Sequence, residues 1–192
     1  MSESDPDGGF GMIELKSPVN PEEVKKLRAG DAVKITGIIY TGRDAAHKRL
    51  CELLEKGEAL PIDVNNACIY YVGPTPAKPG RAIGSAGPTS SYRMDPYSEP
   101  LLKEGLKVMI GKGPRDKAFK EMLPKYGAVY MSAIGGAAAS ISETVKTCEV
   151  VTYEDLGAEA IHRLEVQDFY AIVTYDSEGN DLFEQGIAEY KK

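Results

Sequence analysis

The chain has 192 residues, of which 42% are hydrophobic and 27% are charged, and its formal net charge is −6. This apolar fraction excludes intrinsic disorder over most of the chain, and a chain of this length can bury a core without disulfide or metal cross-links. The acidic balance and the lack of a basic stripe argue against binding to nucleic acid or to an anionic membrane surface. The longest apolar stretches, such as 128–134, are far shorter than the roughly 20 residues of a membrane-spanning helix.

The N-terminus and the cysteines indicate a protein of the cytoplasm. Met1 to Gly11 are rich in Ser, Asp and Gly and lack the basic and apolar regions of a signal peptide, so we expect a disordered tail before one domain over 12–192. Cys51, Cys68 and Cys148 are widely spaced, which suits free, structural thiols in a reducing compartment. Because the chain has no C-x-x-C pair, we expect no zinc or iron–sulfur site built from this chain alone.

Apolar periodicity and helix-capping residues predict the elements in chain order. In the first half these are a helix over 20–30, a strand over 31–40, a helix from Asp44 to Gly57, and a short buried strand over 67–72. Two stretches rich in Pro, Gly and small residues, 73–80 and 84–91, predict irregular loops.

The second half continues the alternation. The expected elements are a helix from Asp95 to Gly105, a strand over 107–110, a helix over 116–126, a strand over 128–134, an Ala-rich helix from Gly135 to about Lys146, a strand over 149–153, a helix over 158–164 and a strand over 171–175. Strands that alternate with helices predict a single layered α/β domain with a largely parallel sheet.

Three loops that follow strands carry candidate binding residues. In α/β sheets, ligands usually bind where loops leave the carboxyl ends of strands. Each of these loops combines a cation with glycine or a helix start: 41–47 with Arg43, 84–93 with Arg93, and 111–113 with Lys112. Cations beside free backbone N–H groups suit a small anion, and cations on three separate loops suggest a dianionic or larger acid.

Structural explanations exist for several of these residues. Asp44 could be a simple N-cap and His47 a simple first-turn residue, while Arg43 could form a surface ion pair worth about 0–1 kcal/mol. The glycine pair at 135–136 could cradle a phosphate, but close packing of a helix on the sheet explains it as well, and we favour packing. His162 is expected to be structural. The Walker loop and the dinucleotide-binding fingerprint do not occur in their required contexts.

Five ordered segments resemble the class I, iron–sulfur fumarate hydratases: 40–50 (YTGRDAAHKRL), 70–81 (YYVGPTPAKPGR), 84–95 (GSAGPTSSYRMD), 109–113 (MIGKG) and 133–139 (AIGGAAA). The resemblance covers the chain from about Glu14 to Leu182 and concerns the C-terminal domain, which is a separate β subunit in two-subunit members. The β subunit of L(+)-tartrate dehydratase is a close relative. The resemblance implies a swivelling β/β/α domain, with a layered sheet and helices, that docks against a larger α subunit.

The same resemblance implies the reaction and the division of labour. The reaction is the reversible hydration of fumarate to (S)-malate, and the partner α subunit holds a [4Fe–4S] cluster whose open iron acts as a Lewis acid. This chain would therefore be inactive alone. Arg43, Arg93 and Lys112 match positions that bind the substrate carboxylates, and Thr89 matches a position proposed as the base for the C3 proton. The expected partners are the α subunit and a C4 dicarboxylate, with no nucleic acid and no membrane.

The proton-transfer group remains open between Thr89 and His47. A threonine hydroxyl is a poor base unless a cationic site favours its alkoxide, and hydrogen bonding to the substrate is its alternative role. Histidine titrates near neutrality, so His47 is the other candidate, and Asp44 could orient Arg43 or His47. Residues 45–48 and 74–80 are more similar to fumarase than to tartrate dehydratase. A non-catalytic anion-binding or assembly module is the remaining alternative.

Overall fold

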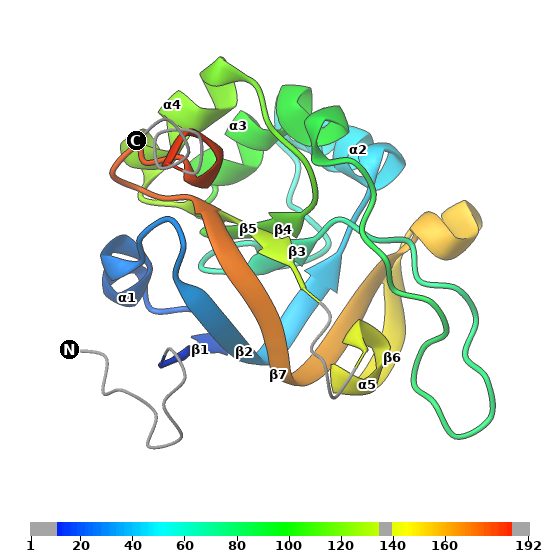
Figure 1. Cartoon of the computed structure of the whole chain (residues 1–192). Coiled ribbons are helices and arrows are strands. Elements are labelled where there is room, and N and C mark those ends of the chain that lie inside the picture. Colours follow the sequence, from blue (N-terminus) through cyan, green and yellow to red (C-terminus); the bar gives the residue numbers. More distant parts are fainter. Residues whose placement is uncertain (1–10, 135–139, 186–192) are drawn as a thin grey trace.

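Helices and strands alternate along the part of the chain that the computed structural model describes, residues 11–134 and 140–185. The order of elements (Figure 1) is β1 (Ile13–Ser17), α1 (Pro21–Lys26), β2 (Ala32–Thr41), α2 (Asp44–Glu55), β3 (Cys68–Tyr70), the 3-10 helix η1 (Ser91–Met94), α3 (Asp95–Lys103), β4 (Val108–Gly111), α4 (Lys117–Tyr126), β5 (Val129–Ala133), α5 (Ile141–Thr144), β6 (Val145–Thr152), the 3-10 helix η2 (Glu154–Glu159) and β7 (Ile161–Tyr175). Within these two ranges, no helix is both long and apolar enough to cross a bilayer.

The sheet closes on itself. Strands β2, β3, β4 and β5 are parallel neighbours in that order, and β7 pairs antiparallel with both β5 and β2. Closure is possible because β2 and β7 are long enough to pair with several neighbouring strands. One edge of β2 pairs with β1 and then β3 while the other pairs with β7, and β7, with 15 residues, also pairs with β6 and then β5. Strands β1 and β6 therefore flank a small barrel.

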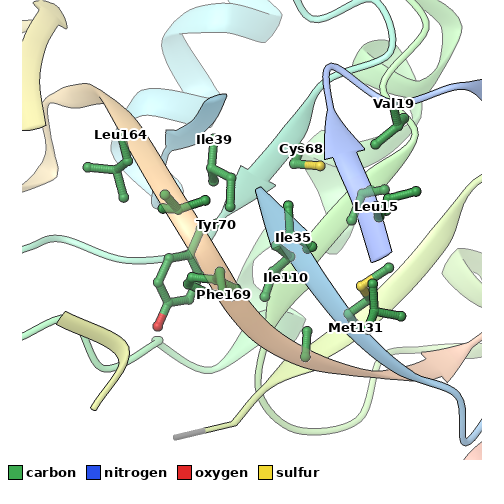
Figure 2. Packing of buried hydrophobic residues seen from close by; sticks show 14 of the residues in the cluster. Leu15, Val19, Ile35, Ile39, Cys68, Tyr70, Ile110, Met131, Leu164 and Phe169 are labelled. Carbon is green, nitrogen blue, oxygen red and sulfur yellow. The ribbon is translucent and has the colours of Figure 1, made fainter. Parts of the chain in front are cut away.

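Apolar side chains fill the interior of this barrel (Figure 2). The ring strands supply fully buried residues that meet there: Ile35, Ile39, Tyr70, Ile110, Met131 and Phe169. The rings of Tyr70 and Phe169 pack edge to face, with their centroids 5.2 Å apart. The hydroxyl of Tyr70 donates a hydrogen bond to the Ala86 carbonyl. This bond ties the loop that leads to Thr89 directly to the barrel core.

A second apolar cluster lies between the outer face of the barrel and the helices α2, α3 and α4. Successive residues of a strand point to opposite faces, so Tyr70 lies inside the barrel and Tyr71 lies beneath the helices. Leu50 of α2, Leu101 of α3 and Phe119 of α4 supply the helical side of this cluster. Burial on both faces explains why the central strands are continuous apolar runs instead of alternating ones.

The structure confirms the expected helices and strands between residues 20 and 134, with shifted ends, and adds β1, which the sequence analysis does not identify. Two later expectations are wrong. Helix α5 ends at Thr144 and Val145 already begins β6, so no helix reaches Lys146. The helix expected over 158–164 is replaced by the end of η2 and the start of β7, where buried Leu164 and Val166 alternate with exposed Glu165.

The expected sheet arrangement also needs correction. Because β7 is antiparallel to β2, β5 and β6, the sheet is mixed and not largely parallel. The chain is a mixed α/β protein, but the layered arrangement is not confirmed because the sheet closes on itself. The glycine pair at 135–136 and the tail residues 1–10 lie outside the described residues.

Candidate active site

The loops that carry the predicted site residues leave one end of the barrel. Since β2, β3 and β4 are parallel neighbours, their carboxyl ends lie side by side. Arg43 follows the end of β2, Lys112 follows the end of β4, and β3 leads into the loops that precede Thr89. The sheet topology therefore brings the three predicted loops to a common end of the molecule.

Ion pairs join Arg43, Asp44 and Arg93. Nε of Arg43 lies 3.7 Å from Oδ1 of Asp44, and Nη1 of Arg93 lies 4.0 Å from Oδ2 of the same carboxylate. Glu159 of η2 also approaches Arg43, with Oε1 3.6 Å from its Nε. Within the described residues, Arg43 Nε and Asp44 Oδ1 are buried and make no hydrogen bond. The two guanidinium groups thus share one carboxylate through contacts that are longer than hydrogen bonds.

Asp44 is not the N-cap of α2. The N-cap is Arg43, whose backbone is extended, and no side chain caps this helix. The carboxylate of Asp44, the first helical residue, instead lies between Arg43 and Arg93. Gly73 allows this arrangement because a Cβ at this position would lie 3.3 Å from Cδ of Arg43 and 3.1 Å from the Ala158 carbonyl oxygen.

Backbone pairing of Ser90 and Ser91 places the segment from Thr89 to Arg93 beside Lys112. The Thr89 N–H donates to the Tyr71 carbonyl at 2.9 Å, which fixes Thr89 at the end of β3. The Ser91 N–H donates to the Lys112 carbonyl at 3.0 Å, and the Lys112 N–H donates back to Ser91 Oγ at 2.8 Å. The side chains of Arg93 and Lys112 are exposed, and Thr89 is half-buried. These segments therefore present two cations and a hydroxyl near the loop of Arg43.

His47 lies beneath this surface. Its ring is buried, with 1% of its surface exposed, and contacts the ring of Tyr71 edge to face at 5.4 Å. Nδ1 lies 2.8 Å from the Arg43 carbonyl oxygen. Because a carbonyl only accepts, Nδ1 carries the proton of the neutral ring. Burial lowers the pKa of His47 to about 4, although the hydrogen bond to Arg43 opposes the shift, so His47 is neutral at pH 7.

Two charged residues near the site were not singled out from the sequence. Glu159, which pairs with Arg43, falls in the stretch that was expected to be helical. Arg115 follows the Lys112 loop, and its side chain is fully buried in an ion pair with Asp95. A glycine and a proline precede Arg115, and Asp116 and Lys117 follow it, so its neighbours indicate a surface turn. A buried arginine beside three aromatic rings is visible only in the folded protein.

The described residues do not fit an iron–sulfur cluster held by this chain. No group of three or more His, Cys, Asp or Glu side chains within 11–134 and 140–185 could hold a metal ion. The cysteines lie apart, on α2, β3 and β6. Burial raises the pKa of Cys51 to about 11 and that of Cys68 to about 12, so both are thiols at neutral pH and not the thiolates that bind metals.

Comparison with known proteins identifies the family. The profile of the family described as "Fumarase C-terminus" matches residues 2–186. The chain belongs to this family. Among its fumarase relatives, "Fumarate hydratase 1, mitochondrial" of Leishmania major is 39% identical over 179 residues, or 91% of the chain. "Fumarate hydratase class I, aerobic" of Escherichia coli strain K12 is 37% identical over 191 residues, or 86% of the chain.

The chain is shorter than these fumarate hydratases. It covers 32% of the Leishmania protein and 35% of the E. coli protein. In contrast, it covers 87% of a protein of Methanocaldococcus jannaschii that is provisionally named L(+)-tartrate dehydratase subunit beta, with 39% identity over 170 residues. The chain is thus similar to the C-terminal part of class I fumarate hydratases and, over most of its length, to a tartrate dehydratase beta subunit.

Proposed function

We propose that this chain is the β subunit of a cytoplasmic two-subunit hydro-lyase that interconverts fumarate and (S)-malate. The observation that carries the proposal is the arrangement of Arg43 and Arg93 around Asp44, with Lys112 and Thr89 on the neighbouring segment. Family membership and the match to 87% of a beta subunit support it. The end of the barrel that bears these residues would dock against a cluster-bearing α subunit, with the swivelling fold that the resemblance implies.

The cations would bind the two carboxylates of the substrate. Guanidinium groups bind carboxylates in a bidentate manner, and the lysine supplies a compact charge. Asp44 holds the two guanidinium groups near each other, since it contacts both. A dicarboxylate held at both ends exposes one face of its double bond, and such positioning lowers the barrier by several kcal/mol.

Thr89 and His47 would have different roles. Conversion of malate to fumarate removes a proton from C3 and hydroxide from C2, which leave together as water. Thr89 is half-buried, and its neighbour Ser90 bridges to Lys112. We assign Thr89 to the C3 proton, because cations on the adjoining segments would favour its alkoxide. His47 is buried and neutral, so we assign it a positioning role through the Arg43 carbonyl. The cluster would belong to the partner, and this chain would contribute binding, orientation and the proton-transfer group.

Tartrate is the second candidate substrate. The relative whose length the chain nearly matches carries the name of a tartrate dehydratase subunit, and tartrate is also a C4 dicarboxylate. Its extra hydroxyl group needs one more hydrogen-bonding partner in the site than malate does. Cations that bind the two carboxylates do not by themselves separate these acids.

An anaerobic assay of the reconstituted complex tests the proposal. The formation of fumarate from malate is followed by ultraviolet absorbance with the chain alone and with a cluster-bearing α subunit, and tartrate is the parallel substrate. We expect activity with malate only in the mixture. Arg93→Ala should raise KM about 10- to 100-fold, because a hydrogen bond to a charged group contributes about 1.5–3 kcal/mol. Activity with tartrate alone would change the substrate, and an inactive complex with an intact cluster would favour a non-catalytic module.

The matched control is Arg28→Met. Arg28 is exposed and pairs with Glu178 at 3.3 Å, so it belongs to no part of the proposed site. Its kinetics should equal those of the unmodified complex. An equal loss of activity in Arg93→Ala and Arg28→Met would show that the effect of Arg93 is not specific.

A further inference from the structure

Beneath the site, one buried arginine makes an unusual set of polar contacts. The guanidinium of Arg115 pairs with Asp95 through Nε, donates to the Tyr71 hydroxyl at 3.3 Å through Nη1, and donates to the Ser98 hydroxyl at 3.1 Å through Nη2. The Arg115 side chain has no exposed surface, and the side chain of Asp95 is only 8% exposed. All three guanidinium nitrogens thus contact acceptors within the protein.

Aromatic rings enclose the same group. Cζ of Arg115 lies 3.5 Å from the centroid of Phe119, and the rings of Tyr130 and Tyr71 lie at 5.0 and 5.2 Å. Removing an arginine and a carboxylate from water costs several kcal/mol per ion, and replacing a buried ion pair with apolar residues is often neutral or stabilising. Stability of the fold alone therefore does not explain this pair.

The contacts of Arg115 lie on the segments that carry the candidate site. Asp95 follows Arg93 by two residues, and its second oxygen accepts from the Asp116 N–H at 3.1 Å. Tyr71, whose hydroxyl accepts from Arg115, accepts the Thr89 N–H through its carbonyl. Arg115 itself follows the Lys112 loop in the chain. One side chain thereby joins the segments of Thr89, Arg93 and Lys112.

Tyr130 of β5 also joins the segment of Arg93 to the Lys112 loop. Its hydroxyl donates to the Gly113 carbonyl at 2.8 Å and shares a hydrogen bond of 2.9 Å with Ser91 Oγ. Ser91 Oγ also accepts the Lys112 N–H. The contacts of Arg115 with Tyr71 and Ser98 and the contact of Tyr130 with Ser91 are buried, so these groups exchange little with water and hold the two segments in one relative position.

We propose that Arg115 is a positioning residue that sets the separation of Arg93 and Lys112, and thereby the fit of the site to a C4 dicarboxylate. Its effect on the segments can be measured without any activity, while its effect on substrate binding rests on the proposed function. Arg115 does not touch the substrate. It acts through Asp95 and Tyr71 on the residues that do.

Amide hydrogen exchange by NMR on the full chain tests the structural part. In Arg115→Met, exchange of the Thr89, Ser91 and Lys112 amides should rise about 10-fold or more relative to that of Val173, whose N–H donates to the Asp31 carbonyl on the barrel. A uniform rise, or no rise, would overturn the proposal. If Arg115→Met does not fold, Tyr71→Phe replaces it, because this change keeps the ring and removes one acceptor of Arg115. The same amides should then exchange faster, and unchanged exchange would overturn the proposal.

Kinetics of the complex test the part that concerns substrate. Arg115→Lys keeps a charge beside Asp95 but cannot reach the same three acceptors, and it should raise KM for malate about 10-fold or more. A purely structural role would reduce the amount of active enzyme and leave KM unchanged. The control Arg28→Met should change neither. An unchanged KM in the folded variant overturns the link to the substrate. An inactive complex of the unmodified chain would refute the proposed function instead, and the exchange result would stand independently.

Discussion

The close approach of Gly111 to Ser91 makes Gly111→Ala a sharp test of the site architecture. A Cβ at Gly111 would overlap Ser91 Oγ and would lie 2.7 Å from Cδ2 of Tyr71. Overpacking of this kind costs about 1–3 kcal/mol, and displacement of Ser91 also weakens the hydrogen bond from the Lys112 N–H, worth about 1 kcal/mol. The free energy of unfolding should fall by about 2–4 kcal/mol. For a chain of this size, Tm should fall by about 4–16 °C.

Two further variants make this prediction refutable. Gly87→Ala is the matched control because a Cβ there meets nothing within 4 Å, and its effect should stay within about 0.5 kcal/mol. Ser91→Ala removes the overlapping oxygen, so the double variant Gly111→Ala/Ser91→Ala should recover part of the stability relative to the sum of the single changes. Unfolding is followed by circular dichroism in urea and on heating. Equal stability of Gly111→Ala and Gly87→Ala would refute the packing argument. So would a double variant whose loss of unfolding free energy equals the sum of the losses in Gly111→Ala and Ser91→Ala.

Three other predictions concern side chains of the site and the core. If Thr89 transfers the proton in the proposed complex, Thr89→Val should lower kcat by about 100-fold or more and Thr89→Ser should retain most of it, because proton transfer contributes about 10²–10⁴-fold. Equal kcat in both variants would exclude a role for the hydroxyl. The pKa of His47 is about 4 in the folded protein and 6.5 in the unfolded chain. Stabilisation of the fold by neutral His47 is therefore complete above pH 6.5 and is lost as the pH falls toward 4. The free energy of unfolding, measured in urea, should fall by about 3 kcal/mol between pH 7 and pH 4, and this fall should be absent in His47→Gln. The same pH dependence in the variant and the unmodified chain would contradict the burial argument. Burial raises the pKa of Cys68 to about 12, so Cys68 should stay unlabelled by a thiol reagent at pH 8 until urea unfolds the chain, whereas rapid labelling of the native protein would contradict its position in the barrel.

The convergence of the site loops could be predicted from the sequence because it depends on local signals. Arg43 and Lys112 each follow a strand directly, and parallel neighbouring strands bring their carboxyl ends together. The position of Asp44 between two guanidinium groups could not be predicted, since a first-turn aspartate is equally suited to capping. Glu159 and Arg115 were missed because their contacts with Arg43 and Asp95 depend on tertiary packing.

The closure of the sheet was beyond local sequence patterns. Residues 158–164 (AEAIHRL) combine good helix formers, yet Leu164 pairs with Ile39 of β2 and with Cys148 of β6. Pairing on both edges of a strand outweighs an intrinsic preference of a few tenths of a kcal/mol per residue. The antiparallel return of β7 depends on contacts between distant parts of the chain, which a pattern over ten or so residues does not encode.

The late place of β7 in the chain has a consequence for biosynthesis. All the residues proposed for the site lie between Arg43 and Lys112, but the edge of β2 on which Ile35 pairs with Phe169 is completed only by β7. While the ribosome is still making residues 113–160, one edge of β2 is unpaired and open to association with other chains. Contacts between such distant residues also form slowly. A polypeptide that terminates before β7 would therefore contain every side chain proposed for the site and still lack the closed barrel that holds them in place.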